Sequence, residues 1–171
     1  RFSLARFYER RARRILPALL LVVAVCIPAA YALLLPSEMK EFGQSLVATM
    51  TFSSNILFWP QTGYFEGAAE MKPLLHTWSL AVEEQFYLFF PLFMMLAWRW
   101  GRAWLTALLI LVAIASLALA QWGALHKPIA AFFLLPTRAW ELIIGVLVAL
   151  HLSRPGQKEV PLAVRNGASL L

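Results

Sequence analysis

The sequence predicts an all-α protein, a polytopic bundle of transmembrane helices with about five membrane segments. Of the 171 residues, 61% are hydrophobic and 14% are charged. Soluble domains carry about 45–50% apolar and about 25% charged residues, so these charges are too few to cover a soluble surface. Uncharged stretches long enough to cross a bilayer also recur along the chain, which supports the same fold class.

The positive charge is concentrated near the start of the sequence. Residues 1–14 hold six Arg and one Glu, which is +5 of the formal net charge of +6. Because this block directly precedes an apolar run, it is typical of a cytoplasmic anchor under the positive-inside rule, and a nucleic-acid partner is disfavoured. The single cysteine, Cys26, excludes an internal disulfide, and no spacing of metal ligands occurs, so no metal is expected.

The first two predicted segments differ in polarity. Residues 15–35 contain no charge, and these 21 residues measure about 31 Å as an α-helix. A short polar link at 36–41 precedes residues 42–59, which are uncharged but contain seven polar side chains. A helix facing lipid would not carry polar groups on all sides, so this second segment is either a buried helix or a re-entrant segment lined by protein.

Three further segments follow a loop at 60–76. The stretch 77–98 contains two adjacent Glu, 103–122 contains no charge and has Trp residues near both ends, and 137–152 has an Arg and a Glu near its start. Tryptophan is enriched at both membrane interfaces, which fits the ends of 103–122. We expect a membrane domain over residues 1–152 and, over 153–171, a polar linker that leads into the start of a further helix.

Two arguments about topology disagree. If all five segments cross, Arg99, Arg102 and the basic residues of 153–165 lie outside, against the positive-inside rule. If 42–59 is re-entrant, the same charges return to the cytoplasmic side. The placement of the polar clusters favours five crossings, and this is the topology we expect.

Charges inside the predicted spans need a reason, because each costs about 2.5–3.5 kcal/mol at the centre of a helix while one Leu returns about 0.3–0.6 kcal/mol. His76, Glu83 and Tyr87 share one helix face and could present three polar groups to one cavity. Alternatively, Glu83 pairs with an Arg of another helix and only stabilises the bundle. Arg138 and Glu141 are three residues apart, so they form an internal ion pair, or Arg138 reaches a phosphate or carboxylate in the same cavity.

The arginine block also has two interpretations. Arginines at a cytoplasmic helix start contact anionic lipid, which is worth about 1 kcal/mol each. Arg11 and Arg14, three residues apart, could instead clamp a phosphorylated ligand, since guanidinium groups bind phosphate oxygens in a bidentate manner. The residues alone favour lipid contact.

Several strings resemble motifs of the acyltransferase-3 family of integral membrane acyltransferases. The first is Phe7-Tyr8-x-Arg10-Arg11-x-x-Arg14-Ile15-x-Pro17, and the second runs over 73–87 (PLLHTWSLAVEEQFY) and is followed by Pro91. The third is PTRAWEL at 136–142 with Gly145 after it, and Ser54-Asn55 is a smaller match. They occur in family order, and together they cover about residues 2–150.

The resemblance implies a multi-pass O-acyltransferase of a bacterial plasma membrane. Such enzymes take an acyl group, often acetyl, from acyl-CoA as a co-substrate on the cytoplasmic side, with no tightly bound cofactor. The acceptor is a hydroxyl of a cell-surface glycan or of a small molecule. By this resemblance the donor-binding residues are Arg10, Arg11 and Arg14. The residues expected to line the central cavity are Asn55, His76, Trp78, Ser79, Glu83, Glu84, Tyr87, Arg138 and Glu141.

The family's catalytic His lies upstream of the arginine block, so no catalytic residue is assigned here, and His76 belongs to a different motif. We therefore expect the 171 residues to be the middle of a longer protein and to be inactive alone. A rival interpretation is a carrier or flippase subunit, because embedded Glu, Arg and His also line transport paths. A third is an inactive relative that supports a complex.

Overall fold

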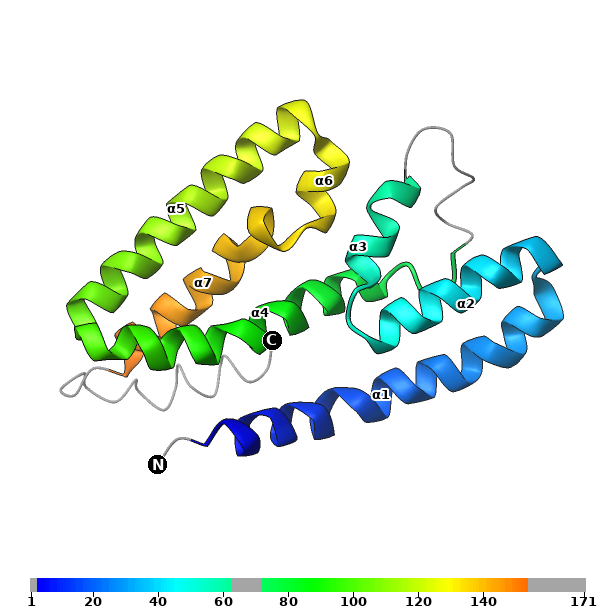
Figure 1. Cartoon of the computed structure of the whole chain (residues 1–171), viewed down its shortest axis with the longest axis horizontal. Coiled ribbons are helices and arrows are strands. Elements are labelled where there is room, and N and C mark those ends of the chain that lie inside the picture. Colours follow the sequence, from blue (N-terminus) through cyan, green and yellow to red (C-terminus); the bar gives the residue numbers. More distant parts are fainter. Residues whose placement is uncertain (1–2, 63–71, 154–171) are drawn as a thin grey trace, which may run out of the picture.

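The computed structural model describes residues 3–62 and 72–153, and every regular element within these ranges is a helix (Figure 1). The prediction of an all-α, polytopic membrane bundle is confirmed, since four of the helices are long and apolar enough to cross a membrane. The predicted start of a further helix after residue 153 lies outside the described residues.

The first helix, α1 (Leu4–Leu33), begins earlier than the predicted 15–35 because the arginine block is itself helical. The Ser3 side chain caps it by accepting a hydrogen bond from the backbone N–H of Arg6. Its 30 residues measure about 45 Å, which exceeds the roughly 30 Å of a bilayer core. The basic first turns therefore have room to reach the membrane surface.

The predicted segment 42–59 is two short helices, α2 (Pro36–Met50) and α3 (Ser54–Phe58). The first begins earlier than predicted because Pro36 occupies the first turn and the Glu38 carboxylate accepts a hydrogen bond from the Leu35 backbone N–H. It ends where the Thr51 hydroxyl donates to the Val47 carbonyl, and Phe52 adopts a left-handed backbone with φ 51°. Fifteen residues measure about 22 Å, too short to cross.

The other spans lie close to their predicted positions. They are α4 (Thr77–Ala97) with its terminal 3₁₀ turn Trp98–Trp100, α5 (Arg102–His126), and α6 (Pro128–Phe133) continued by α7 (Leu135–Leu152). Gly101, at φ 90°, makes the tight turn between α4 and α5. With α1, they are the helices able to cross, and α6 and α7 together count as one span.

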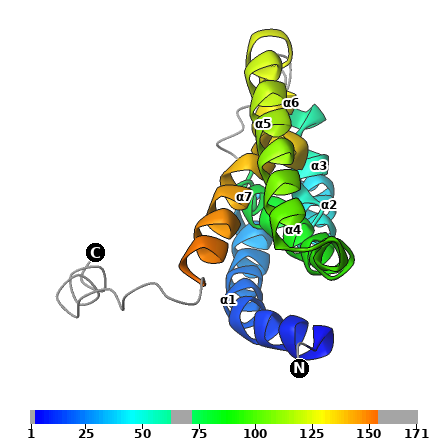
Figure 2. The same cartoon turned by 90° about the vertical axis from the view of Figure 1, so that its left-hand side faces the viewer.

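Contacts along the chain fix the directions of these helices. On α1, Tyr8 and Arg11 contact Leu88 and Glu84 of α4, while Ala30 belongs to the same apolar cluster as Leu74, which precedes α4. The two helices are therefore antiparallel. Figure 1 shows the start of α1, the α4–α5 turn and the end of α7 at one end of the molecule. Viewed from that end, α5 lies on the opposite side of the bundle from α1, with α4 and α7 between them (Figure 2).

This arrangement overturns the expected five crossings. Because α2 and α3 do not cross, Arg99 and Arg102 lie at the same end as the arginine block, as the positive-inside rule requires of cytoplasmic charges. The charge count thus predicted the better of the two topologies.

Two apolar clusters and one set of buried hydroxyls hold the described helices together. Phe86, Leu105, Leu109 and Ile143 centre the cluster between α4, α5 and α7, and a second cluster joins α1 to α2. Between them, the Thr77 hydroxyl lies 2.9 Å from that of Thr49 and 3.1 Å from that of Ser54. Four of the seven polar residues of 42–59 are thus buried inside the protein, namely Ser45, Thr49, Ser54 and Asn55, whereas Gln44 and Thr51 are exposed.

Candidate functional site

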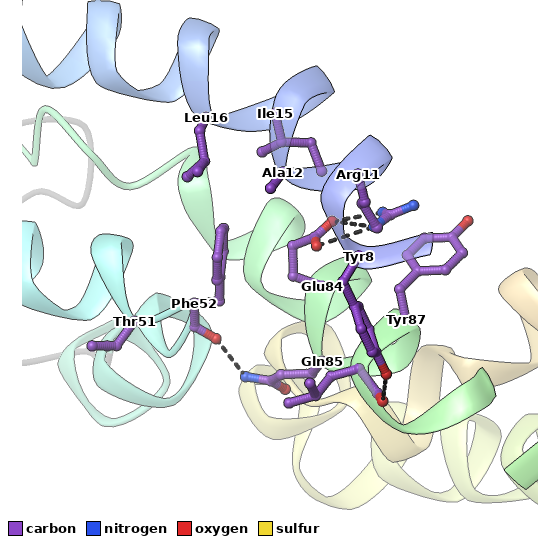
Figure 3. A pocket seen from close by; sticks show the side chains of 11 residues that line it. Tyr8, Arg11, Ala12, Ile15, Leu16, Thr51, Phe52, Glu84, Gln85 and Tyr87 are labelled. Carbon is purple, nitrogen blue, oxygen red and sulfur yellow. Dashed lines mark hydrogen bonds and ion pairs between the residues drawn. The ribbon is translucent and has the colours of Figure 1, made fainter. Parts of the chain in front are cut away.

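A cavity of about 280 Å³ lies between α1, the turn after α2, and α4 (Figure 3). Its volume is near the lower end of the range of ligand sites, which starts at about 300 Å³. The lining residues come from segments up to 80 residues apart in the sequence. They are Tyr8, Arg11, Ala12, Ile15, Leu16, Thr51, Phe52, Glu84, Gln85, Tyr87 and Leu88.

Arg11 and Glu84 form the strongest polar contact in this cavity. The Arg11 Nε donates to Glu84 Oε1 at 2.8 Å and to Oε2 at 3.1 Å, and Nη2 donates to Oε1 at 2.6 Å. The two side chains are only 18% and 13% exposed. The guanidinium carbon also lies 3.3 Å from the centroid of the Tyr87 ring, a cation–π contact. The pair therefore joins α1 to α4 with its charges mutually compensated.

The opposite wall is held by two amide side chains. Gln85 Nε2 donates to the Phe52 carbonyl at 2.9 Å and to Asn55 Oδ1 at 2.8 Å, while Asn55 Nδ2 donates to the Phe133 carbonyl at 3.1 Å. Asn55 is 1% exposed and lies behind the cavity. These bonds fix the left-handed turn at Phe52 against α4, and such conformations cost about 1–3 kcal/mol unless surrounding contacts support them.

The structure distinguishes between the two adjacent glutamates. Glu84 points at Arg11, whereas Glu83 is exposed, so the anticipated pairing of a glutamate with an Arg of another helix occurs one residue later than predicted. Successive residues on a helix point about 100° apart, and α1 approaches α4 on the side of Glu84. Of the predicted face, only Tyr87 lines the cavity, and His76 is exposed.

The three predicted donor-binding arginines separate into two groups. Arg11 lines the cavity, whereas Arg10 and Arg14 are exposed and lie outside it. These two are four residues apart and share a helix face. Neither side chain has an ion pair or hydrogen bond among the described residues, although Arg13 between them pairs with Glu9 at 2.8 Å. Donor contact by these arginines stays a prediction.

A second polar group lies at the start of α7. Arg138 and Glu141 form an internal ion pair at 3.1 Å, which is one of the two predicted alternatives, with side chains 30% and 45% exposed. The Arg138 guanidinium carbon lies 5.2 Å from the Trp78 ring centroid. Together with Ser79, which is exposed, these residues do not line the cavity that contains Arg11. Their role in a functional site stays a prediction.

Sequence reasoning missed Tyr8, Phe52 and Gln85 as cavity residues. Tyr8 donates its hydroxyl to the Leu88 carbonyl at 2.8 Å and closes the cavity beside Tyr87 (Figure 3). Gln85 continues the polar run Glu83-Glu84 inside a span, a signal that could have been used. Phe52 carries no such signal, since its backbone conformation is set by the fold.

Comparison with known proteins identifies the family. The model of the acyltransferase domain of the acyltransferase-3 family matches residues 1–167, so the chain belongs to this family of membrane acyltransferases. It is 33% identical over 178 residues to an uncharacterized protein of Haemophilus influenzae, covering 99% of this chain and 72% of that protein. No solved structure matches.

Two relatives carry functional names. The chain is 28% identical over 175 residues to the peptidoglycan O-acetyltransferase OatA of Listeria monocytogenes, with 99% of the chain and 28% of the relative covered. It is 33% identical over 93 residues to the O-acetyltransferase OatA of Staphylococcus aureus, with 54% of the chain and 15% of the relative covered. The chain thus spans less than a third of these two O-acetyltransferases.

Proposed function

We propose that the full-length protein is a membrane O-acyltransferase that moves an acyl group, with acetyl as the leading candidate, from acyl-CoA to a hydroxyl of a cell-surface glycan or a similar acceptor. Family membership and the two O-acetyltransferase relatives support the reaction class. The observation that carries the donor assignment is the basic end of α1, which lies directly beside the cavity.

The chemistry of these residues suits a coenzyme A donor. Its phosphate groups are anionic, and guanidinium groups bind phosphate oxygens with paired, charge-assisted hydrogen bonds. The positive-inside rule places the same end of α1 in the cytoplasm, where we expect the donor to be available. Lysine would attract anionic lipid as well as arginine does, so the exclusive use of Arg in this block favours a directed contact.

In the proposed reaction, a general base removes the proton of the acceptor hydroxyl, and the hydroxyl oxygen attacks the thioester carbonyl. The C–S bond then breaks, the ester forms, and coenzyme A leaves as its thiol after taking up the proton. Hydrogen-bond donors aimed at the carbonyl oxygen stabilise the charge that develops there. We assign no base among the cavity residues, because Glu84 is already engaged by Arg11.

The test uses membranes that contain the full-length protein, acetyl-CoA labelled in the acetyl group, and a glycan acceptor. We expect transfer of label, and we expect Arg14→Ala to raise the KM for acetyl-CoA about tenfold, the equivalent of about 1.4 kcal/mol, without loss of membrane insertion. Arg13→Ala is the matched control, because it removes the same charge from a side chain that already pairs with Glu9. An unchanged KM in Arg14→Ala would contradict the donor assignment.

A carrier or flippase would behave differently in the same membranes. It would move a solute across the bilayer whether or not acetyl-CoA is present, and no ester-linked label would form. Membranes that show such movement, and no more acetyl transfer than membranes without the protein, would contradict the proposed function.

A further inference from the structure

A second hollow of the described structure lies on the outer side of α2 and α3. It is a groove of about 730 Å³, and its described lining residues all belong to α2, α3 and the turn between them. This volume lies within the range of about 300–1,000 Å³ that is typical of ligand sites. Apart from Thr51, it shares no lining residue with the cavity that contains Arg11, so it is a separate surface.

One face of α2 forms the floor of the groove. Lys40, Gln44, Val47 and Thr51 follow one another at intervals of four, three and four residues, which places them on the same side of the helix. All four side chains are exposed. The Lys40 amine and the Gln44 amide have no ion pair or hydrogen bond among the described residues, so both are available to a ligand.

This polar face lies beside a membrane span. On the opposite side of α2, Phe42 belongs to the apolar cluster that contains Ala30, within the uncharged stretch 15–35 of α1. Gln44 lies about 12 Å along α2 from its first residue, at a depth where lipid offers no hydrogen-bond partner. Irregular backbone such as the turn at 51–53 is tolerated at this depth only where it is buried in protein or lines a water-filled cavity. The groove therefore does not face lipid.

The groove opens toward the end of the molecule opposite the arginine block. Lys40 lies near the start of α2, and Figure 1 shows the turn between α1 and α2 far from the α4–α5 turn. Thr51 lies about 16 Å further along, at the inner end of the groove. Since the positive-inside rule places the arginine block in the cytoplasm, the groove opens to the extracytoplasmic side. Thr51 also lines the cavity that contains Arg11, so a single turn of backbone separates the two hollows.

The groove offers the polar groups that a ligand rich in hydroxyls requires. The Lys40 amine and the Gln44 amide donate hydrogen bonds, while the Gln44 carbonyl and the hydroxyl oxygens of Thr51 and Ser53 accept them. No carboxylate occurs among the described lining residues. The remaining surface, which includes Val47, is apolar and suits the C–H face of a sugar ring.

We propose that this groove binds the acceptor, as a sugar unit of a glycan that enters from the extracytoplasmic side. This inference rests on the proposed function, and it puts the acceptor hydroxyl across the turn at 51–53 from the cavity that contains Arg11. The alternative occupant of the groove is a further helix of the full-length protein, and the experiment distinguishes the two.

The first measurement is the accessibility of the groove to water. It uses intact cells with the full-length protein in a background without reactive cysteines, Cys26→Ala included. Because the thiolate is the reactive form and forms only in contact with water, we expect Gln44→Cys to react with an impermeant thiol reagent at least about tenfold faster than Leu117→Cys. Leu117 is the matched control, since it is 50% exposed on α5 and lies about 13 Å from the outer end of that helix.

The second measurement is protection by the acceptor. The probe is the soluble glycan that accepts label in the transfer assay. At saturation it should slow the reaction of Gln44→Cys about tenfold, a readout that does not depend on turnover.

The third measurement uses a variant that fills the groove without weakening α2. A Cβ at Gly43, which lines the groove, would meet no atom within 4 Å, and leucine has a higher helix propensity than glycine. We expect Gly43→Leu to raise the KM for the glycan about tenfold and to leave the KM for acetyl-CoA unchanged. The matched control is Ser37→Leu, which adds the same side chain to an exposed position of α2 outside the groove.

The outcomes are distinct. A Gln44→Cys variant that reacts no faster than Leu117→Cys overturns the inference, because lipid or another helix then covers the groove. Reaction that the glycan does not slow overturns it as well, and so does a Gly43→Leu variant with an unchanged KM for the glycan. If Gly43→Leu does not accumulate in the membrane, Gln44→Leu removes the amide from the same groove and is judged by the same KM. A wild-type protein that transfers no label would instead contradict the proposed function itself.

Discussion

The contact between Arg11 and Glu84 makes a quantitative prediction about stability. Both side chains are more than four-fifths buried, and three hydrogen-bond distances of 2.6–3.1 Å join them. Removing one partner of a buried pair typically costs about 3–5 kcal/mol, because the remaining charge is left without compensation. Since some exposure remains here, we expect Arg11→Ala or Glu84→Ala to lower the free energy of unfolding by about 3 kcal/mol.

The double variant isolates the interaction. When both residues are Ala, no unpaired charge remains, so the loss should be smaller than the sum of the two single losses by about 2–3 kcal/mol, at the upper end of measured coupling energies. The exposed pair Arg13–Glu9 on the same helix is the matched control. Its side chains are 79% and 55% exposed, and such i,i+4 pairs contribute about 0.3–0.5 kcal/mol.

The assay is reversible unfolding in mixed micelles with increasing denaturing detergent, followed by tryptophan fluorescence, since the chain contains seven Trp residues. The double-variant cycles give one coupling energy for Arg11–Glu84 and one for the control pair Arg13–Glu9, and these two values are compared. A coupling energy for Arg11 and Glu84 no larger than that of the control pair would refute the account of the cavity wall.

Two further predictions concern the fold. Asn55→Leu should lower the free energy of unfolding by about 1–3 kcal/mol, because it removes one of the two acceptors of Gln85 Nε2 and leaves the Phe133 carbonyl without its Asn55 donor. The double variant Asn55→Leu/Gln85→Leu should lose less stability than the sum of the two single losses. An additive double variant would contradict the amide pair. In a Cys26→Ala background, a cysteine placed at Arg99 should react with an impermeant thiol reagent from the cytoplasmic side and one at Lys127 from the other side. Reaction of both from one side would exclude the four-span topology.

The spans and the family were predictable from the sequence because both depend on local signals. The uncharged stretch 103–122 lies within a single helix, and the motif around residues 73–87 identified the acyltransferase family. The segment 42–59 was harder. Its polar side chains suggested a protein-lined segment correctly, but the break at 51–53 depends on hydroxyl caps and a left-handed Phe52 that only the folded neighbours stabilise.

The features of the site that the sequence did not predict depend on the rotation of each helix about its own axis. Sequence spacing showed that two glutamates lie inside a span but could not decide which of them meets an Arg, since Glu83 and Glu84 point about 100° apart. For the same reason, Arg11 and Arg14 were grouped as one clamp, although only Arg11 turns toward α4. The packing of α1 against α4 decides which glutamate and which arginine meet. That packing joins residues more than 70 positions apart, so local sequence spacing does not reveal it.

The most direct test of the central claim, that acyl-CoA is used at the basic end of α1, compares membrane vesicles of opposite orientation. Labelled acetyl-CoA, which does not cross the bilayer, is added outside vesicles that contain the full-length protein. We predict transfer of label to the glycan acceptor only in inside-out vesicles, which expose the end of α1 with Arg10 and Arg14. Transfer only in right-side-out vesicles, or in neither orientation, would contradict the account.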